Sequence, residues 1–212
     1  NKSLDFGREA ILEKYVYGSK SLFEPGSGYH YSNTNYELLT MIMDQVYPKG
    51  HASFYTFRIL SRLGLEKTYY KEETRYNDLY NRGMANGYIA QSKEGTLVNA
   101  TDLSLSIASG LTGSDGVLSN VLDLYTFFKS IIDGDIVDRE SVAPLRSIEF
   151  GKFGKAIGLS GQHPGYTTEL WYLLDQQTYI VCQMNVGESL LALAESKPNY
   201  QVVEKILATV MD

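Results

Sequence analysis

Apolar residues recur at helical spacing directly after a turn-rich segment near the start of the chain. The recurring positions are Leu38, Leu39, Ile42, Met43 and Val46. Because residues three or four apart share one helix face, this pattern predicts an amphipathic helix, which Pro48-Lys49-Gly50 ends. Thr34 and Glu37 have the spacing of a capping box, so Tyr31 and Asn33 are expected just outside the helix start.

Other stretches carry weaker helical patterns. The predicted helices lie around residues 11–16, from His51 to Leu63 with a stop at Gly64, from a cap at Ser119 or Asn120 to Asp133-Gly134, just after Asp138, and from Ser196-Pro198 to Val210. Between Leu65 and Leu111 no apolar period is clear. Irregular connections, short strands and one helical turn are expected there.

The last third of the chain has the sequence pattern of a β-sheet. Thr167 to Leu174 and Thr178 to Val186 are separated by the turn Asp175-Gln176-Gln177, which predicts an antiparallel hairpin. Tyr179 to Met184 is almost continuously apolar, so both sheet faces should be covered by helices. We therefore expect an α+β fold, with a mostly helical region at 1–147 and antiparallel strands plus a C-terminal helix at 148–212, together forming one continuous partial domain.

Composition and charge exclude several classes of function. The chain has 212 residues and a net charge of −6, and its basic residues are scattered, so no nucleic-acid partner is expected. No apolar run is long enough to span a bilayer, and no signal peptide opens the chain. The three histidines are too dispersed for a zinc site, and the single Cys182 reads as a buried, inert thiol, so no metal or cofactor is expected.

Three segments carry candidate chemistry. They are Tyr31-Ser32-Asn33 with the residues to Leu39 and Phe23-Glu24-Pro25-Gly26 before it, Gly116 to Phe128, and Gly158 to Tyr166. In this order they resemble the class C β-lactamase and penicillin-binding-protein superfamily: its YxN motif, its internal glycine-to-helix segment and its third motif. Without that resemblance, Tyr31 would read as a packed loop tyrosine and Asn33 as a helix cap.

The resemblance implies a serine hydrolase with an acyl-enzyme mechanism. In that superfamily the serine of an S-x-x-K motif attacks an acyl carbonyl, and the lysine and the YxN tyrosine manage its proton. Carried over, Tyr31 is the catalytic acid/base and Asn33 holds the substrate amide. The implied third motif is Leu159-Ser160-Gly161, on a strand beside the cleft, with the Gln162 N–H as an oxyanion donor. The implied substrate-binding residues are Leu159, Ser160, Gly161, Gln162 and His163.

The nucleophile is the first departure from that pattern. No S-x-x-K and no G-x-S-x-G occurs, and the nearest matches, Thr68-Tyr69-Tyr70-Lys71 and Thr126-Phe127-Phe128-Lys129, have threonine and follow YxN. The superfamily places its serine well upstream of YxN. The chain is therefore expected to be the C-terminal part of a longer enzyme, without the N-terminal strands and the nucleophile helix, and inactive alone. A tyrosine with its ordinary pKa of ~10 would need that pKa lowered by about 3, roughly 4 kcal/mol of help, to be deprotonated at neutral pH, and the missing lysine would supply it.

Leu159 is the second departure, because the superfamily usually has lysine or histidine there. That cation commonly helps to bind a substrate carboxylate, so Leu159 argues against carboxypeptidase or β-lactamase specificity and makes an esterase or another acyl hydrolase easier to credit. A different register would use His163-Pro164-Gly165 as H-x-G. A rival interpretation is a non-catalytic module that binds a peptide or glycan without turnover.

Partners and location follow from the same resemblance. A small-molecule or peptide substrate is expected. An uncovered sheet edge and apolar surface, left by the missing strands and helix, predict self-association. The superfamily is usually exported to the periplasm, the cell envelope or the medium.

Overall fold

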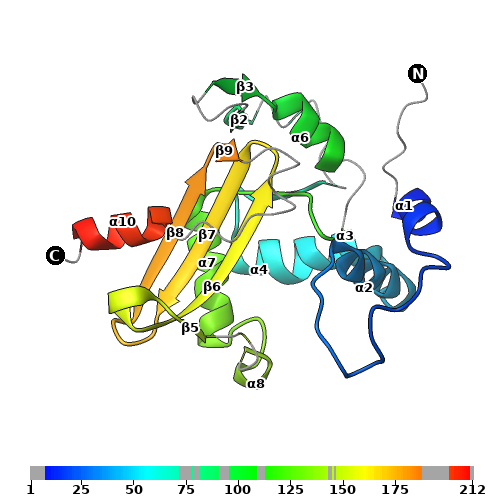
Figure 1. The fold of residues 1–212 in the computed structure, drawn as a ribbon, viewed down its shortest axis with the longest axis horizontal. Helices are drawn as coiled ribbons and strands as arrows, with labels where there is room; N and C mark the ends of the chain where they lie inside the picture. The colour runs from blue at the N-terminus through cyan, green and yellow to red at the C-terminus, as the bar shows by residue number, and fades with distance from the viewer. Residues whose placement is uncertain are drawn as a thin grey trace. The chain divides into compact units, whose positions relative to one another are not determined.

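The computed structural model describes residues 8–71, 78, 82–90, 96–108, 113–142, 145, 147–187 and 201–210. Figure 1 shows their helices and strands in chain order by colour. The chain divides into two compact units that alternate along the sequence. The first unit comprises Asn1–Arg62, Tyr69–Gly83 and Leu105–Leu118, and the second comprises Leu63–Thr68, Met84–Ser104 and Ser119–Asp212. Each unit is described by itself below.

The first unit is mainly helical. Its elements are α1 (Arg8–Tyr15), α2 (Asn33–Val46), α3 (Gly50–Tyr55), the π-helical turn η1 (Thr56–Leu60), the start of α4 (Ser61–Leu63), and the antiparallel strands β1 (Tyr69–Tyr70) and β4 (Val117–Leu118). Leu12 of α1 is 1% exposed, as its place in the apolar period predicts. The helix expected from His51 to Leu63 is present and ends before Gly64, which adopts a positive φ of 66°.

A four-stranded antiparallel sheet dominates the second unit. It contains β5 (Ser147–Glu149), β6 (Lys155–His163), β7 (Tyr166–Leu173) and β8 (Thr178–Met184) in that order. Tyr172 and Tyr179 pair on one face, where Phe128 of α7 (Val121–Asp133) packs edge-on against Tyr179. On the other face, Trp171 and Leu173 pack against α10 (Gln201–Val210). The prediction of a hairpin covered by helices on both faces is confirmed.

Smaller elements complete the second unit. They are β2 (Tyr88–Ala90), β3 (Leu97–Asn99), α6 (Thr101–Ala108, which continues into the first unit), α8 (Arg139–Val142), the 3₁₀ turn η3 (Gly151–Phe153) and β9 (Val186–Gly187). β2 pairs antiparallel with β3 and parallel with β9. The eight-residue α6 is longer than the single turn expected in this region. Ser196 and Pro198, the expected start of the last helix, lie outside the described residues.

The expected capping box at α2 is wrong. Ser32 is the N-cap: its backbone is extended (φ −150°, ψ 134°) and its hydroxyl accepts a hydrogen bond from the Thr34 N–H at 3.3 Å. Thr34 therefore lies inside the helix, and Asn33 is its first residue rather than a residue before it. Ser32 has the side chain that a cap requires, and the Glu37 carboxylate binds elsewhere.

Candidate active site

Tyr31 and Asn33 form a pair at the start of α2. The extended backbone of Ser32 places Tyr31 immediately before the helix and Asn33 in its first turn. The Tyr31 hydroxyl donates a hydrogen bond to Asn33 Oδ1 at 3.0 Å. Tyr31 is 58% exposed, so this polar pair is open to molecules in solution.

Two other tyrosines, Tyr29 and Tyr36, influence Tyr31. The rings of Tyr31 and Tyr36 lie 5.7 Å apart, centroid to centroid, in a tilted arrangement. Partial burial raises the pKa of Tyr31 above its ordinary value, and the neighbouring Tyr36 and Tyr29 raise it further. The phenol is therefore protonated at neutral pH and acts as a hydrogen-bond donor, as the contact with Asn33 requires.

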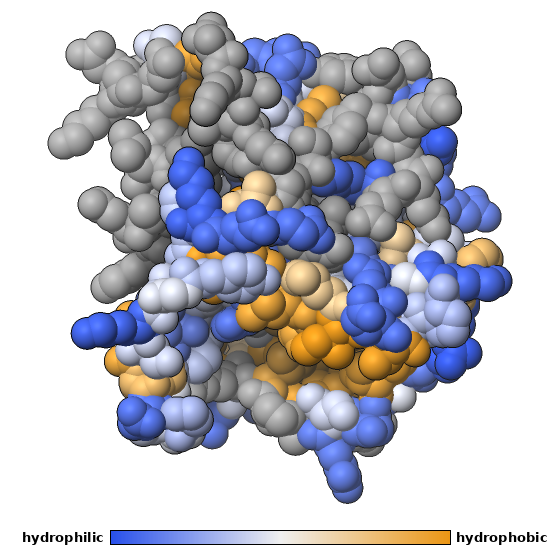
Figure 2. All heavy atoms as spheres, turned by 90° about the vertical axis from the view of Figure 1, so that its right-hand side faces the viewer, coloured by the Kyte–Doolittle hydropathy of each residue, from blue (hydrophilic) through white to orange (hydrophobic). Residues whose placement is uncertain are grey.

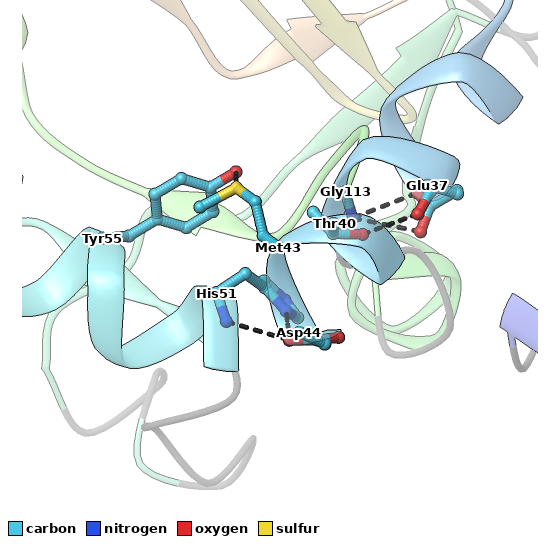
Figure 3. Close-up of polar contacts among 7 residues, drawn as sticks. All are labelled: Glu37, Thr40, Met43, Asp44, His51, Tyr55 and Gly113. Carbon is cyan, nitrogen blue, oxygen red and sulfur yellow. Dashed lines mark hydrogen bonds and ion pairs between the residues drawn. The ribbon is translucent and has the colours of Figure 1, made fainter. Parts of the chain in front are cut away.

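A buried carboxylate anchors the second turn of α2 (Figure 3). Glu37 is 2% exposed, and its carboxylate accepts hydrogen bonds from Gly113 N–H, Ser114 N–H and the Ser114 hydroxyl. Hydrogen bonds to a charged group contribute about 1.5–3 kcal/mol each. Sequence reasoning missed this role because Glu37 fitted a capping box, whereas its true partners lie 76 and 77 residues away.

A second polar contact anchors the far end of the same helix. The Asp44 carboxylate oxygen Oδ1 accepts from the His51 backbone N–H at 2.9 Å and from His51 Nδ1 at 2.6 Å. His51 is buried, with its ring edge-on to Tyr55 and Tyr70 (Figure 3 shows the contact with Asp44). Asp44 and His51 thus join α2 to α3.

The residues of the predicted third motif lie on β6 in the second unit. Ser160 and Gly161 are exposed, while Leu159, Gln162 and His163 are half-buried. Within the described residues, β5 pairs only with the stretch 155–157 of β6, so the same edge of the strand from Gly158 to His163 has no strand beside it. A Cβ added to Gly161 would meet nothing within 4 Å, which leaves open space at this position.

Two contacts fix this part of β6. Gly158 faces Trp171, and a Cβ added to Gly158 would come within 2.1 Å of the indole, so only glycine fits. At the end of the strand, His163 Nε2 donates to the Ser104 carbonyl oxygen at 2.9 Å. This bond anchors the end of β6 to α6 within the second unit.

The predicted site residues thus fall into two groups. Tyr31 and Asn33 contact each other in the first unit, and Leu159 to His163 follow one strand in the second. Among the described residues no cluster of three or more His, Cys, Asp or Glu side chains could hold a metal ion. In the same residues no helix is long and apolar enough to cross a membrane.

The first unit thus carries a tyrosine–asparagine pair at a helix start, and the second unit carries a four-stranded antiparallel sheet. The model of the Beta-lactamase family matches residues 5–196 of the chain. The chain belongs to the beta-lactamase family.

Known relatives agree with this assignment. Penicillin-binding protein 4* of Bacillus subtilis (strain 168) is 26% identical over 201 residues, an alignment that covers 81% of this chain and 43% of that protein. D-amino acid amidase from Ochrobactrum anthropi SV3, solved with D-phenylalanine, has the same fold, with a TM-score of 0.73, 20% identity, and coverage of 89% of this chain and 60% of the amidase. The octameric penicillin-binding protein homologue from Pyrococcus abyssi has a TM-score of 0.72 and 24% identity over 100% of this chain and 49% of its own.

The chain is shorter than these relatives. It spans less than two thirds of each of them, from 43% of the penicillin-binding protein to 60% of the amidase. The mixed α/β architecture with antiparallel sheets, expected from the sequence, is confirmed by these neighbours.

Proposed function

We propose that this chain supplies part of the active site of a serine hydrolase that cleaves amide or ester bonds through an acyl-enzyme. The observation that carries this proposal is the exposed Tyr31–Asn33 pair, with its 3.0 Å hydrogen bond, in a chain of the beta-lactamase family. Tyr31 is the general acid/base and Asn33 binds the substrate amide. The name of the amidase relative supports an amide substrate.

The raised pKa of Tyr31 favours the protonated phenol in this chain. A protonated phenol can give its proton to a leaving group, whereas a base would need the phenolate. The nucleophilic serine and a lysine that lowers the pKa of Tyr31 are expected from an S-x-x-K motif upstream of Asn1. The chain alone is therefore expected to lack turnover.

The open edge of β6 is the proposed place for the extended part of the substrate. From Gly158 to Gly161 no described strand pairs with this edge, and such an edge offers backbone N–H and C=O groups to a peptide-like ligand. Leu159, Ser160, Gly161, Gln162 and His163 are the proposed contacts, with the Gln162 N–H as oxyanion donor. Leu159 carries no charge, so a substrate without a carboxylate at this position is preferred.

Fluorophosphonate labelling tests the proposed function. We expect no serine adduct on the isolated 212-residue chain, and an adduct on the parent protein that carries S-x-x-K upstream. In that parent, Tyr31→Phe should slow labelling about 10²- to 10⁴-fold, the usual contribution of a general acid/base. Tyr17→Phe changes another exposed tyrosine of the first unit and serves as the control. An adduct on a serine of the isolated chain, or unchanged labelling of Tyr31→Phe, would overturn the proposal.

A non-catalytic binding module is the second candidate. The absence of S-x-x-K from these 212 residues and the leucine at position 159 favour it. This candidate predicts that an upstream reading frame supplies no S-x-x-K and that peptide or glycan fragments bind without covalent labelling.

Self-association and an exported location belong to the same proposal. Relatives named as penicillin-binding proteins support a cell-envelope location. The exposed apolar residues of α2 form the surface proposed for contact between copies.

A further inference from the structure

Both oxygens of the Glu37 carboxylate accept hydrogen bonds, although the side chain is almost completely buried. Oε1 accepts from Ser114 N–H at 2.8 Å and from the Ser114 hydroxyl at 2.7 Å, and both oxygens lie 3.1 Å from Gly113 N (Figure 3 shows Glu37 and Gly113). Two consecutive backbone N–H groups and a hydroxyl thus converge on one side chain. All of these groups belong to the first unit.

Gly113 brings its segment unusually close to the helix. A Cβ at this position would lie 2.3 Å from the Tyr36 carbonyl oxygen and 2.8 Å from the Glu37 Cα. Because both are backbone atoms, a side chain could be accommodated only if the segment or the helix moved. The Glu37 hydrogen bonds therefore hold the segment directly against the first turns of α2.

The same turns carry the candidate catalytic pair. Asn33 lies four residues before Glu37, on the same side of the helix. Tyr36, whose carbonyl oxygen faces Gly113, has its ring against Tyr31. A continuous set of contacts therefore leads from Ser114 through Glu37 and Tyr36 to the Tyr31 ring.

We propose that Glu37 is a positioning residue, which holds the first turns of α2 against Gly113-Ser114 and so orients Tyr31 and Asn33 toward the substrate. This inference rests on the proposed function, because the orientation of Tyr31 and Asn33 matters for catalysis only if they act on a substrate. The orientation itself can be measured without catalysis.

The chain offers a matched control on the same helix. Asp44 also anchors α2 through a carboxylate, but it does so near the C-terminal end and toward His51 (Figure 3). Loss of either anchor should destabilise the first unit. Only the loss of the Glu37 anchor should reorient Tyr31.

The experiment compares Glu37→Gln, Ser114→Ala and Asp44→Asn in the 212-residue chain. Glu37→Gln keeps the side-chain size but turns one acceptor into a donor, and Ser114→Ala removes one donor only, so it tests the contact even if Glu37→Gln fails to fold. NMR with ¹³C-labelled tyrosine follows the Tyr31 phenol, assigned by its loss in Tyr31→Phe. Urea unfolding measures the stability of each variant in parallel.

In the wild type the Tyr31 phenol should titrate above its ordinary pKa and show contacts to the Tyr36 ring. Glu37→Gln should bring the titration toward the ordinary value and weaken those contacts, and Ser114→Ala should do the same to a smaller extent. Asp44→Asn should leave both signals unchanged at a comparable loss of stability.

Unchanged Tyr31 signals in Glu37→Gln, or in Ser114→Ala where the former does not fold, would overturn the inference. An equal change in Asp44→Asn would also overturn it, because the effect would then report only general loosening. The NMR signals can behave as expected even if the parent protein is not labelled by the fluorophosphonate. That result would overturn only the proposed function.

Discussion

Glu169 is a carboxylic acid with no exposed surface, in the middle of β7. Its Oε2 accepts a hydrogen bond from the Trp171 indole N–H at 3.1 Å, whereas Oε1 has no hydrogen-bond partner among the described residues. Burial raises the pKa of Glu169, and the hydrogen bond from Trp171 only partly opposes this effect. A charge at this position is unfavourable, so the neutral acid is the form that suits the fold.

Glu169→Gln is expected to gain stability relative to the wild type as the pH rises. The unfolded glutamate titrates near its ordinary pKa of about 4.3, and the folded one titrates above it. The stability that the neutral acid provides is complete below the ordinary value and is lost as the pH rises through the folded value. Urea unfolding of both proteins at pH 4 and pH 8, values chosen on either side of about 4.3, measures the difference. A pH-independent difference would contradict this prediction.

The sequence reveals the candidate catalytic pair but hides two buried carboxyl groups, for a physical reason. Tyr31 and Asn33 belong to a short motif whose spacing is visible along the chain. Glu37 and Glu169 are recognisable only by burial and by their partners, and the partners of Glu37 are 76 and 77 residues distant. The local sequence pattern does not indicate hydrogen bonds between residues so far apart in the chain.

Helix α7 shows how far local signals can define an element. Its predicted cap and stop are both present: Asn120 Oδ1 accepts from Leu122 N–H at 2.9 Å and from Asp123 N–H at 3.0 Å, and Gly134 is left-handed with a φ of 86°. Both signals act within one turn, so sequence suffices. The strands β1, β2, β3, β4 and β9 have two or three residues each, too few to reveal a period, and depend on partners far along the chain.

Asn120→Ala should lower the free energy of unfolding by about 1 kcal/mol, because two N–H groups at the start of α7 lose their acceptor. Chemical denaturation measures the loss. Asn120→Asp keeps an acceptor at the cap and should retain most of the stability. Leu122→Ala, at a position that is 77% exposed in the same turn, should have little effect. Equal losses in all three variants would argue against the cap.

Helix α2 exposes an unusually apolar surface. Its exposed residues are Asn33, Asn35, Tyr36, Leu38, Leu39, Ile42, Gln45 and Val46, and none of them is charged. The two acidic residues of the helix are occupied: Glu37 is buried, and Asp44 binds His51. Figure 2, which faces the side where α2 is drawn in Figure 1, shows hydrophobic side chains gathered on that face. Such a patch marks an interaction surface.

The isolated chain is therefore expected to self-associate, and Ile42→Glu should weaken that association. Ile42 is 58% exposed, so the change should leave the fold intact while placing a charge in the contact, with a cost of at least about tenfold in the dissociation constant. Sedimentation over a range of concentrations measures it. Leu122→Glu, in the second unit, is the control and should not weaken the association. A monomer at every concentration would contradict the prediction.

The long-range contact of Glu37 also affects how the chain folds during synthesis. The chain passes between its two units after residues 62, 68, 83, 104 and 118, and neither unit is one continuous segment. During synthesis, α2 leaves the ribosome well before Gly113, the residue against which it is anchored 76 positions later. Closing a loop of that length has an entropic cost that must be met before the contact stabilises anything. The start of α2, with Tyr31 and Asn33, is thus synthesised before the segment that anchors it, and it gains this anchor only after Gly113 and Ser114 have followed.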